Sequence, residues 1–259
     1  MAIVSDQMAG LIPWLVVAAA GTTNTGAVDP LAEIAEITAA HNLWFHVDGA
    51  YGAFFALCPE GKAALDGMAA SDSLVLDPHK TLFLPYGSGA VLVKDGSKLY
   101  ASQNWQAAYM QDIPENLHEV SPAELSFELT KHFRGLRLWL PLKLYGLAPF
   151  RAALSEKIHL ARYFHHQIRQ LDGFEAGPEP DLSVATYRFR PPRGDEDEFN
   201  LRLVKAIQDE GRVFISSTRV GGRVLLRAAI SSFRTHLDDV DETLEALKRN
   251  ARHLIEAGN

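Results

Sequence analysis

Hydrophobic and polar residues alternate in the first half of the chain in the way expected of buried strands separated by amphipathic helices. Pro30 opens a helical pattern that places Leu31 and Ile34 on one face, and a second helix is expected over 62–70. Apolar runs of strand length lie at 15–20, 43–48, 73–76 and 90–93. This order of strand and helix predicts an α/β fold with a large, mostly parallel sheet.

The second half of the chain has a different pattern, which predicts a smaller C-terminal α/β domain. A polar stretch without clear periodicity, about 103–128, separates the two halves, and its length favours a functional or mobile loop. The elements expected after it are helices at 131–145 and 149–171, a strand at 183–189, a helix at 199–208, strands at 213–217 and 224–230, and a closing helix from Leu237. We therefore place the large domain at 1–125 and the small domain at 126–259.

Composition and charge narrow the classes of function. The chain has 259 residues and a net charge of −7, which argues against a nucleic-acid or anionic-membrane partner, because both require a basic surface. The single cysteine, Cys58, excludes an internal disulfide, and no Cys/His spacing predicts a metal site. The first apolar run, 11–20, is too short to span a bilayer and has no basic residues before it. Cytoplasm is the expected compartment.

Three of the predicted strands are followed by polar residues that could form one reactive site. Thr23, Asp48 and Lys80 each follow one of these strands, and the carboxyl ends of parallel strands meet at one edge of a sheet. A lysine amine can form a Schiff base with the aldehyde of pyridoxal phosphate. A carboxylate can keep the pyridine nitrogen of that cofactor protonated, which makes the ring an electron sink. The pattern therefore favours a pyridoxal-phosphate site.

An ordered set of motifs makes this interpretation specific. The motifs are Gly21-Thr22-Thr23, His46-Val47-Asp48-Gly49-Ala50-Tyr51, Asp77-Pro78-His79-Lys80, Phe133-Arg134-Gly135-Leu136-Arg137-Leu138-Trp139 and Leu226-Arg227-Ala228. In this order the chain resembles the aromatic-L-amino-acid decarboxylase family, the group II pyridoxal-phosphate decarboxylases, over essentially its whole length. The resemblance implies a fold-type I transferase-like architecture and decarboxylation of an L-amino acid, with an aromatic substrate favoured.

The resemblance also implies roles for individual residues. Lys80 would be the Schiff-base lysine and Asp48 the partner of the pyridinium nitrogen. Thr23 would contact the cofactor, Ala50 would pack against its ring, and His79 would help to place substrate or cofactor beside the lysine.

Asp77 and Tyr109 carry two further implications. Many relatives have Asn where this chain has Asp77, near the cofactor phosphate, and a carboxylate there would repel phosphate unless a donor intervenes. Tyr109, 29 residues after Lys80, matches a loop tyrosine that returns the proton to Cα. Relatives with phenylalanine there tend toward aldehyde formation, so the tyrosine favours plain decarboxylation.

Each of these residues also has a purely structural interpretation. Asp48 alone would be a turn or helix cap, and Lys80 alone a solvated lysine; their joint spacing favours the functional one. Two interpretations of His46 stay open: a residue of the site or a hydrogen-bonded core residue. His165 and His166 are expected to be exposed on a charged helix. The apolar residues around Trp139 are expected to form a helix-packing core.

The resemblance covers only the C-terminal part of the family, so the large domain is expected to be incomplete. The N-terminal half of the family supplies a phosphate-binding loop and a histidine that stacks on the cofactor ring. The alternatives left open are a fragment, one piece of a split enzyme, a non-catalytic paralogue, and another reaction at the same lysine, such as aldehyde formation or transamination. We expect a homodimer or association with the N-terminal segment.

Overall fold

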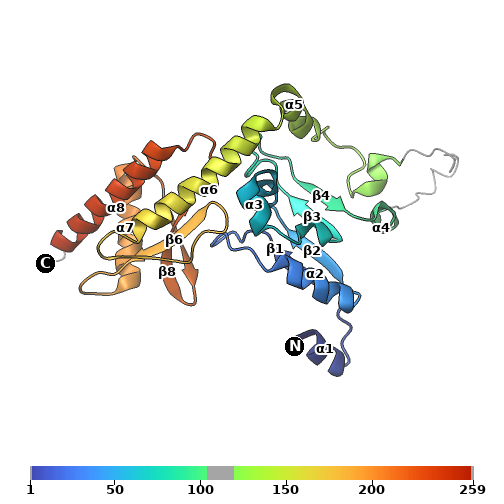
Figure 1. Ribbon diagram of the computed structural model, residues 1–259, viewed down its shortest axis with the longest axis horizontal. Helices are drawn as coiled ribbons and strands as arrows, with labels where there is room; N and C mark the ends of the chain where they lie inside the picture. Colours follow the sequence, from blue (N-terminus) through green and yellow to red (C-terminus); the bar gives the residue numbers. More distant parts are fainter. Residues whose placement is uncertain (1, 104–119, 258–259) are drawn as a thin grey trace.

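A computed structural model describes residues 2–103 and 120–257, which form two sheets with their helices (Figure 1). The first sheet has the strand order β1-β2-β3-β4, with β1 at Leu15–Ala19, β2 at Trp44–Asp48, β3 at Ser73–Leu76 and β4 at Ala90–Val93. The first three strands are parallel, whereas β4 runs antiparallel to β3. The predicted α/β fold with a mostly parallel sheet is confirmed.

The first sheet is held by apolar residues that alternate along its strands. In β2, Phe45 and Val47 are buried, and they pack with Phe55 and Leu82 in one core. Removing each such side chain from water stabilises the fold by roughly 1.5–3 kcal/mol. The elements that accompany this sheet are α1 (Ala2–Met8), α2 (Leu31–Ala40), the 3-10 helix η1 (Ala53–Leu57), α3 (Pro59–Ala64), η2 (Met68–Ala70) and α4 (Gly96–Gln103).

The second sheet is antiparallel throughout and has the order β5-β6-β8-β7. Its strands are β5 (Phe174–Ala176), β6 (Val184–Phe189), β7 (Ser216–Val220) and β8 (Arg223–Ala229). Gly221 and Gly222 join β7 to β8 with φ of 56° and 80°, a left-handed turn that glycine adopts without strain. The helices η4 (Pro122–Leu125), α5 (Leu136–Tyr145), α6 (Ala148–Ile168), α7 (Glu196–Glu210) and α8 (Leu237–Ala257) complete the fold.

Helix α6 packs into both hydrophobic cores. Leu154 and Ile158 belong to the core of the first sheet, while Phe164 and Ile168 belong to the core of the second. In Figure 1, α6 runs from the end of α5 past α3 to the second sheet, where α7 and α8 also lie. The division at residue 125 stays a prediction; it falls between the two sheets in the sequence, and α6 joins them.

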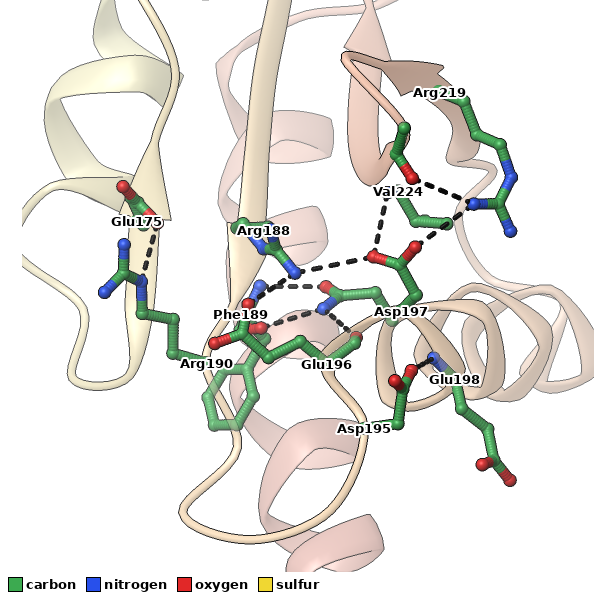
Figure 2. A network of polar contacts seen from close by, with 12 residues as sticks. Glu175, Arg188, Phe189, Arg190, Asp195, Glu196, Asp197, Glu198, Arg219 and Val224 are labelled. Atoms are coloured by element: carbon green, nitrogen blue, oxygen red, sulfur yellow. Dashed lines mark hydrogen bonds and ion pairs between the residues drawn. The ribbon is translucent and has the colours of Figure 1, made fainter.

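A polar network fixes the start of α7 against the second sheet (Figure 2). The guanidinium of Arg188, on β6, lies 2.6 Å from Glu196 and 3.5 Å from Asp197. Asp197 also accepts the backbone N–H of Val224 at 2.9 Å and pairs with Arg219 at 3.1 Å. Arg188 is buried, so its ion pairs compensate a charge withdrawn from water.

Several expected elements differ from those observed. The helix expected over 62–70 is interrupted, because Gly67 adopts a φ of 88° between α3 and η2. Strand β7 occupies Ser216–Val220 rather than 213–217, since the glycine turn sets its pairing with β8. The helix expected from 131 begins at Leu136. Among the α-helices and strands of the described residues, α1, α4 and β5 were not predicted, and neither were the 3-10 helices η1 and η4.

Two expectations about side-chain burial were wrong. Trp139 is 58% exposed, and Leu144, on the same helix, is 67% exposed, so the apolar residues of α5 are not fully packed in a core. His165 was expected to be exposed but is buried, and its Nε2 donates to the carbonyl of Gly177 at 3.0 Å. His166 is exposed as expected. No helix in the described part of the chain is long and apolar enough to cross a membrane.

Candidate active site

The register of the first sheet brings the predicted polar residues to one edge. Ala19 of β1 lies opposite Asp48 of β2, and Asp48 lies opposite Val75 of β3. The residues that follow these parallel strands therefore emerge at the same edge. Thr23, Asp48 and Lys80 all come from this edge, as their positions after the strands predict.

Lys80 lies in a tight turn after β3. Its backbone N–H donates to the carbonyl of Asp77 at 2.9 Å, and the N–H of Leu84 donates to Pro78 at 3.2 Å. The Lys80 side chain is 43% exposed, and its Nζ pairs with Asp77 Oδ2 at 2.9 Å. The amine is therefore accessible and held by one carboxylate. In this arrangement the Asp77 carboxylate is paired with the Lys80 ammonium.

His79 is oriented by the same turn. Its Nδ1 donates to the carbonyl of Ser88 at 2.9 Å, and its ring meets the ring of Tyr86 edge to face at 4.9 Å. Because Nδ1 carries the proton in that bond, Nε2 is the free acceptor of the neutral ring. Nε2 lies 4.0 Å from Asp77 Oδ2. The histidine thus has a fixed orientation beside the lysine.

Asp48 is exposed at the end of β2, although the strand before it is largely buried. Its Oδ1 accepts the N–H of Ala50 at 3.1 Å, and its backbone carbonyl accepts the N–H of Ala20 at 2.8 Å. The side chain therefore caps the following turn, as the structural interpretation holds, and it keeps a second oxygen for another donor. Ala50 is half-buried next to it.

Thr23 lies at the tip of the short loop that follows β1. Thr22 and Thr25 share a hydrogen bond of 2.9 Å between their hydroxyls, and the N–H of Gly26 donates to the carbonyl of Thr22 at 2.8 Å. The carbonyl of Thr23 accepts from Nη2 of Arg227 at 2.8 Å, a contact across 204 residues of sequence. The loop is therefore held from the second sheet.

His46 lies on the sheet rather than at its polar edge. Its Nδ1 is 2.7 Å from Ser73 Oγ, and the same oxygen accepts a hydrogen bond from Trp44 Nε1 at 2.8 Å. The structure thus favours the hydrogen-bonded alternative for His46. Tyr109 lies outside the described residues.

Sequence reasoning missed four residues that support this edge: Tyr51, Thr81, Ser183 and Arg227. Tyr51 and Arg227 stand inside the quoted motifs, and Thr81 directly follows Lys80. Tyr51 and Thr81 could have been identified from the sequence, because each lies next to a candidate residue. Ser183 has no local signal, because its contact with Tyr51 spans 132 residues.

Comparison with known proteins agrees with the chemistry of this edge. Residues 1–190 match a family described as the pyridoxal-dependent decarboxylase conserved domain. The chain belongs to the pyridoxal-dependent decarboxylase family. The predicted resemblance is therefore confirmed, and the predicted cofactor is the one for which this family is named.

Relatives of known name lie within the same family. An aromatic-L-amino-acid decarboxylase of Bacillus atrophaeus is 34% identical over 96% of this chain and 53% of its own length. A phenylacetaldehyde synthase of Arabidopsis thaliana is 30% identical over 98% of this chain and 53% of its own length. The solved structure of Oryza sativa TDC with PLP and tryptamine superposes with a TM-score of 0.90 at 30% identity, covering 98% of this chain and 54% of that one. The chain spans about half the length of the relatives that it matches.

The residues of this decarboxylase-family edge fit pyridoxal phosphate. Lys80 provides an accessible primary amine, and Asp48 provides an exposed carboxylate at the end of the adjacent parallel strand. An aldehyde and a basic ring nitrogen require these two groups. The superposition with fold-type I decarboxylases of known structure confirms the predicted fold class.

Proposed function

We propose that the chain carries the lysine-bearing part of a pyridoxal-phosphate-dependent decarboxylase that acts on an L-amino acid, with an aromatic side chain as the favoured class. The observation that supports this most directly is the pair formed by Lys80 and Asp48, which follow adjacent parallel strands at one sheet edge. The names of the Bacillus and rice relatives support the aromatic class.

Each residue of the site has a separate role in this proposal. The Lys80 amine would bond the cofactor aldehyde, and Asp48 would hold a proton on the ring nitrogen. When bound, the cofactor supplies the electron sink that accepts the electrons released as the substrate carboxylate leaves as carbon dioxide. Ala50 would pack against the ring, Thr23 would contact the cofactor, and His79 would orient the group beside Lys80.

Two further residues have roles that depend on charge and proton transfer. Tyr109 would return a proton from its hydroxyl to the substrate Cα, which favours an amine product. Asp77 would lie near the cofactor phosphate, where its negative charge is partly offset by Lys80 only while their ion pair persists.

A second outcome at the same site is oxidative. The similarity to an Arabidopsis phenylacetaldehyde synthase supports keeping this alternative. Oxidation by dioxygen, followed by hydrolysis with one water, would convert the amino acid to aldehyde, carbon dioxide, ammonia and hydrogen peroxide, whereas decarboxylation yields amine and carbon dioxide alone. Transamination would transfer the amino group without releasing carbon dioxide, so the products separate all three reactions.

We further propose that the catalytic unit requires more surface than this chain alone provides, either a second copy or a segment equivalent to the N-terminal half of its relatives. Large apolar side chains support this. Ile12, Trp14 and Val17, near edge strand β1, are 88%, 69% and 57% exposed. Trp139 and Leu144 on α5 are similarly exposed. Patches of this kind mark interaction surfaces.

The proposed compartment remains the cytoplasm, supported by the single free thiol of Cys58.

The test measures product from L-tyrosine, L-tryptophan and L-phenylalanine with pyridoxal phosphate, using the chain alone and with the N-terminal half of a relative supplied in trans. We expect weak turnover from these 259 residues alone, because the phosphate-binding loop implied by the resemblance belongs to the N-terminal half of the family, and without that loop the cofactor would lose most of its orienting contacts. Supplying that half should release amine and carbon dioxide in equal amounts. Stoichiometric peroxide would instead support the aldehyde reaction. No turnover in any mixture would favour the non-catalytic paralogue.

A further inference from the structure

Tyr51 contacts both halves of the molecule next to the candidate site. Its hydroxyl lies 2.7 Å from Ser183 Oγ and accepts the backbone N–H of Ser183 at 2.9 Å. At the other end of the residue, its backbone carbonyl accepts from Thr81 Oγ1 at 2.7 Å. Thr81 directly follows Lys80 in the chain. One tyrosine therefore joins the start of β6 to the turn that carries the lysine.

The surroundings of Tyr51 are closely packed. Thr81 and Ser183 are both fully buried. A Cβ added to Gly21 would lie 2.6 Å from Tyr51 Cδ1, and a Cβ added to Gly52 would lie 1.9 Å from the carbonyl oxygen of Ala20. The two glycines thus allow the Tyr51 ring and its turn to approach the loop after β1. Burial raises the pKa of Tyr51 to about 12, so its hydroxyl stays protonated at neutral pH.

Two other contacts join the same surfaces. Asp181 Oδ2 accepts the N–H of Val28 at 3.0 Å, and Arg227 donates to the carbonyl of Thr23 at 2.8 Å. The start of β6 and the middle of β8 therefore contact the loops that carry Thr23 and Ala50, and the Lys80 turn is joined to them through the bond from Thr81 to Tyr51. Of these contacts, Tyr51 alone bonds directly to the residue beside Lys80.

We propose that Tyr51 is a positioning residue that fixes the Lys80 turn against the second sheet. It acts through two bonds, from its hydroxyl to Ser183 and from Thr81 to its carbonyl, and it touches no reacting atom. The part of this inference that concerns catalysis rests on the proposed function. The coupling of Ser183 to the Lys80 turn, however, is a property of the cofactor-free chain and can be tested separately.

The first experiment measures backbone amide exchange in the cofactor-free chain. Tyr51→Phe removes the hydroxyl and keeps the ring. Tyr163→Phe is the matched control, because that hydroxyl donates a comparable bond of 2.7 Å to Asp241 between α6 and α8. Losing one neutral hydrogen bond corresponds to about fivefold in a local opening equilibrium. We expect Tyr51→Phe to accelerate exchange at Ser183 and also at Lys80 and Leu84 by about this factor.

Tyr163→Phe should leave the exchange at Lys80 and Leu84 unchanged. Thr81→Val, which removes the bond to the Tyr51 carbonyl with little change in volume, should accelerate the same two amides. In the double variant the effects should be less than additive, because either change alone releases the turn from Ser183. Additive effects, or unchanged exchange at Lys80 and Leu84 in Tyr51→Phe, would overturn the proposal.

The second experiment measures the dissociation constant of pyridoxal phosphate. Tyr51→Phe should raise it about fivefold, and Tyr163→Phe should not. Faster exchange with unchanged cofactor affinity would overturn the positioning role. If the unaltered chain binds no cofactor, the proposed function fails, and the exchange data alone decide whether Tyr51 couples Ser183 to the Lys80 turn.

Discussion

At the scale of single residues, the pair formed by Asp77 and Lys80 is the feature with the clearest functional consequence. The carboxylate holds the amine at 2.9 Å and is only 18% exposed. The same charge would oppose the approach of a phosphate dianion. In the proposed site, the ion pair would therefore favour the cofactor-free arrangement of the turn over the bound one.

Asp77→Asn is expected to tighten the binding of pyridoxal phosphate. Ion pairs of this exposure contribute up to about 1 kcal/mol, which corresponds to an affinity gain of about fivefold. The measurement is a titration followed by the visible absorbance of the bound cofactor at low and at high salt. The gain should shrink in salt, which screens charge repulsion. Weaker binding by Asp77→Asn would contradict this, and would show that the carboxylate orients Lys80 for the reaction.

Residue types and their spacing were sufficient to predict most of this edge. Asp48 and Lys80 follow adjacent strands as expected, because strand ends can be read from apolar runs that stop at polar residues. His46 could not be decided from its position, since its bond to Ser73 crosses to the next strand. Arg227 was noticed only as part of a motif, because its contact with Thr23 depends on how two sheets meet.

At the scale of elements, the start of α7 illustrates how local sequence fixes a boundary. Asp195 precedes the helix with extended φ and ψ of −79° and 126°, and its Oδ1 accepts the N–H of Glu198 at 2.8 Å. The acidic residues of the first turn, Glu196, Asp197 and Glu198, are stabilised by the positive end of the helix dipole. Figure 2 shows this cap beside the ion pairs of Arg188.

Asp195→Ala should lower the free energy of unfolding by about 1 kcal/mol, the usual contribution of such a cap. Asp195→Asn is the matched control, because its amide oxygen can accept the same bond. Chemical denaturation of both variants, followed by circular dichroism, is the measurement. Equal loss in the two variants would show that the charge, rather than the capping bond, stabilises this end of α7.

The same scale explains which elements the sequence predicted poorly. Strand β5 has only three residues and is defined by its pairing with β6, so its own pattern carries little information. Helix α7 was expected from Phe199, but it starts at Glu196, because the first turn is polar and faces Arg188. Apolar periodicity identifies the buried face of a helix, but it does not locate a polar, capped first turn.

At the scale of the whole molecule, the two sheets meet through α6 and through the contacts around Tyr51. Lys157, in the middle of α6, is fully buried, and its Nζ bonds Glu156 at 2.8 Å and the carbonyl of Thr235. The exposed apolar residues of α5 and of the region before β1 belong to this scale too. The apolar residues around Trp139 were expected to form a core, but only the assembled fold shows that they face outward.

The most direct test of the proposed site is to find which lysine bonds the cofactor aldehyde. The chain is mixed with pyridoxal phosphate, the imine is reduced with borohydride, and the labelled peptide is located by mass spectrometry, with Lys80→Ala and Lys98→Ala in parallel. Lys98 is a suitable control because it lies on α4 and contacts the ring of Trp44. We expect the label on Lys80, its loss in Lys80→Ala and its persistence in Lys98→Ala. Label spread over surface lysines, and undiminished in Lys80→Ala, would contradict the proposed site.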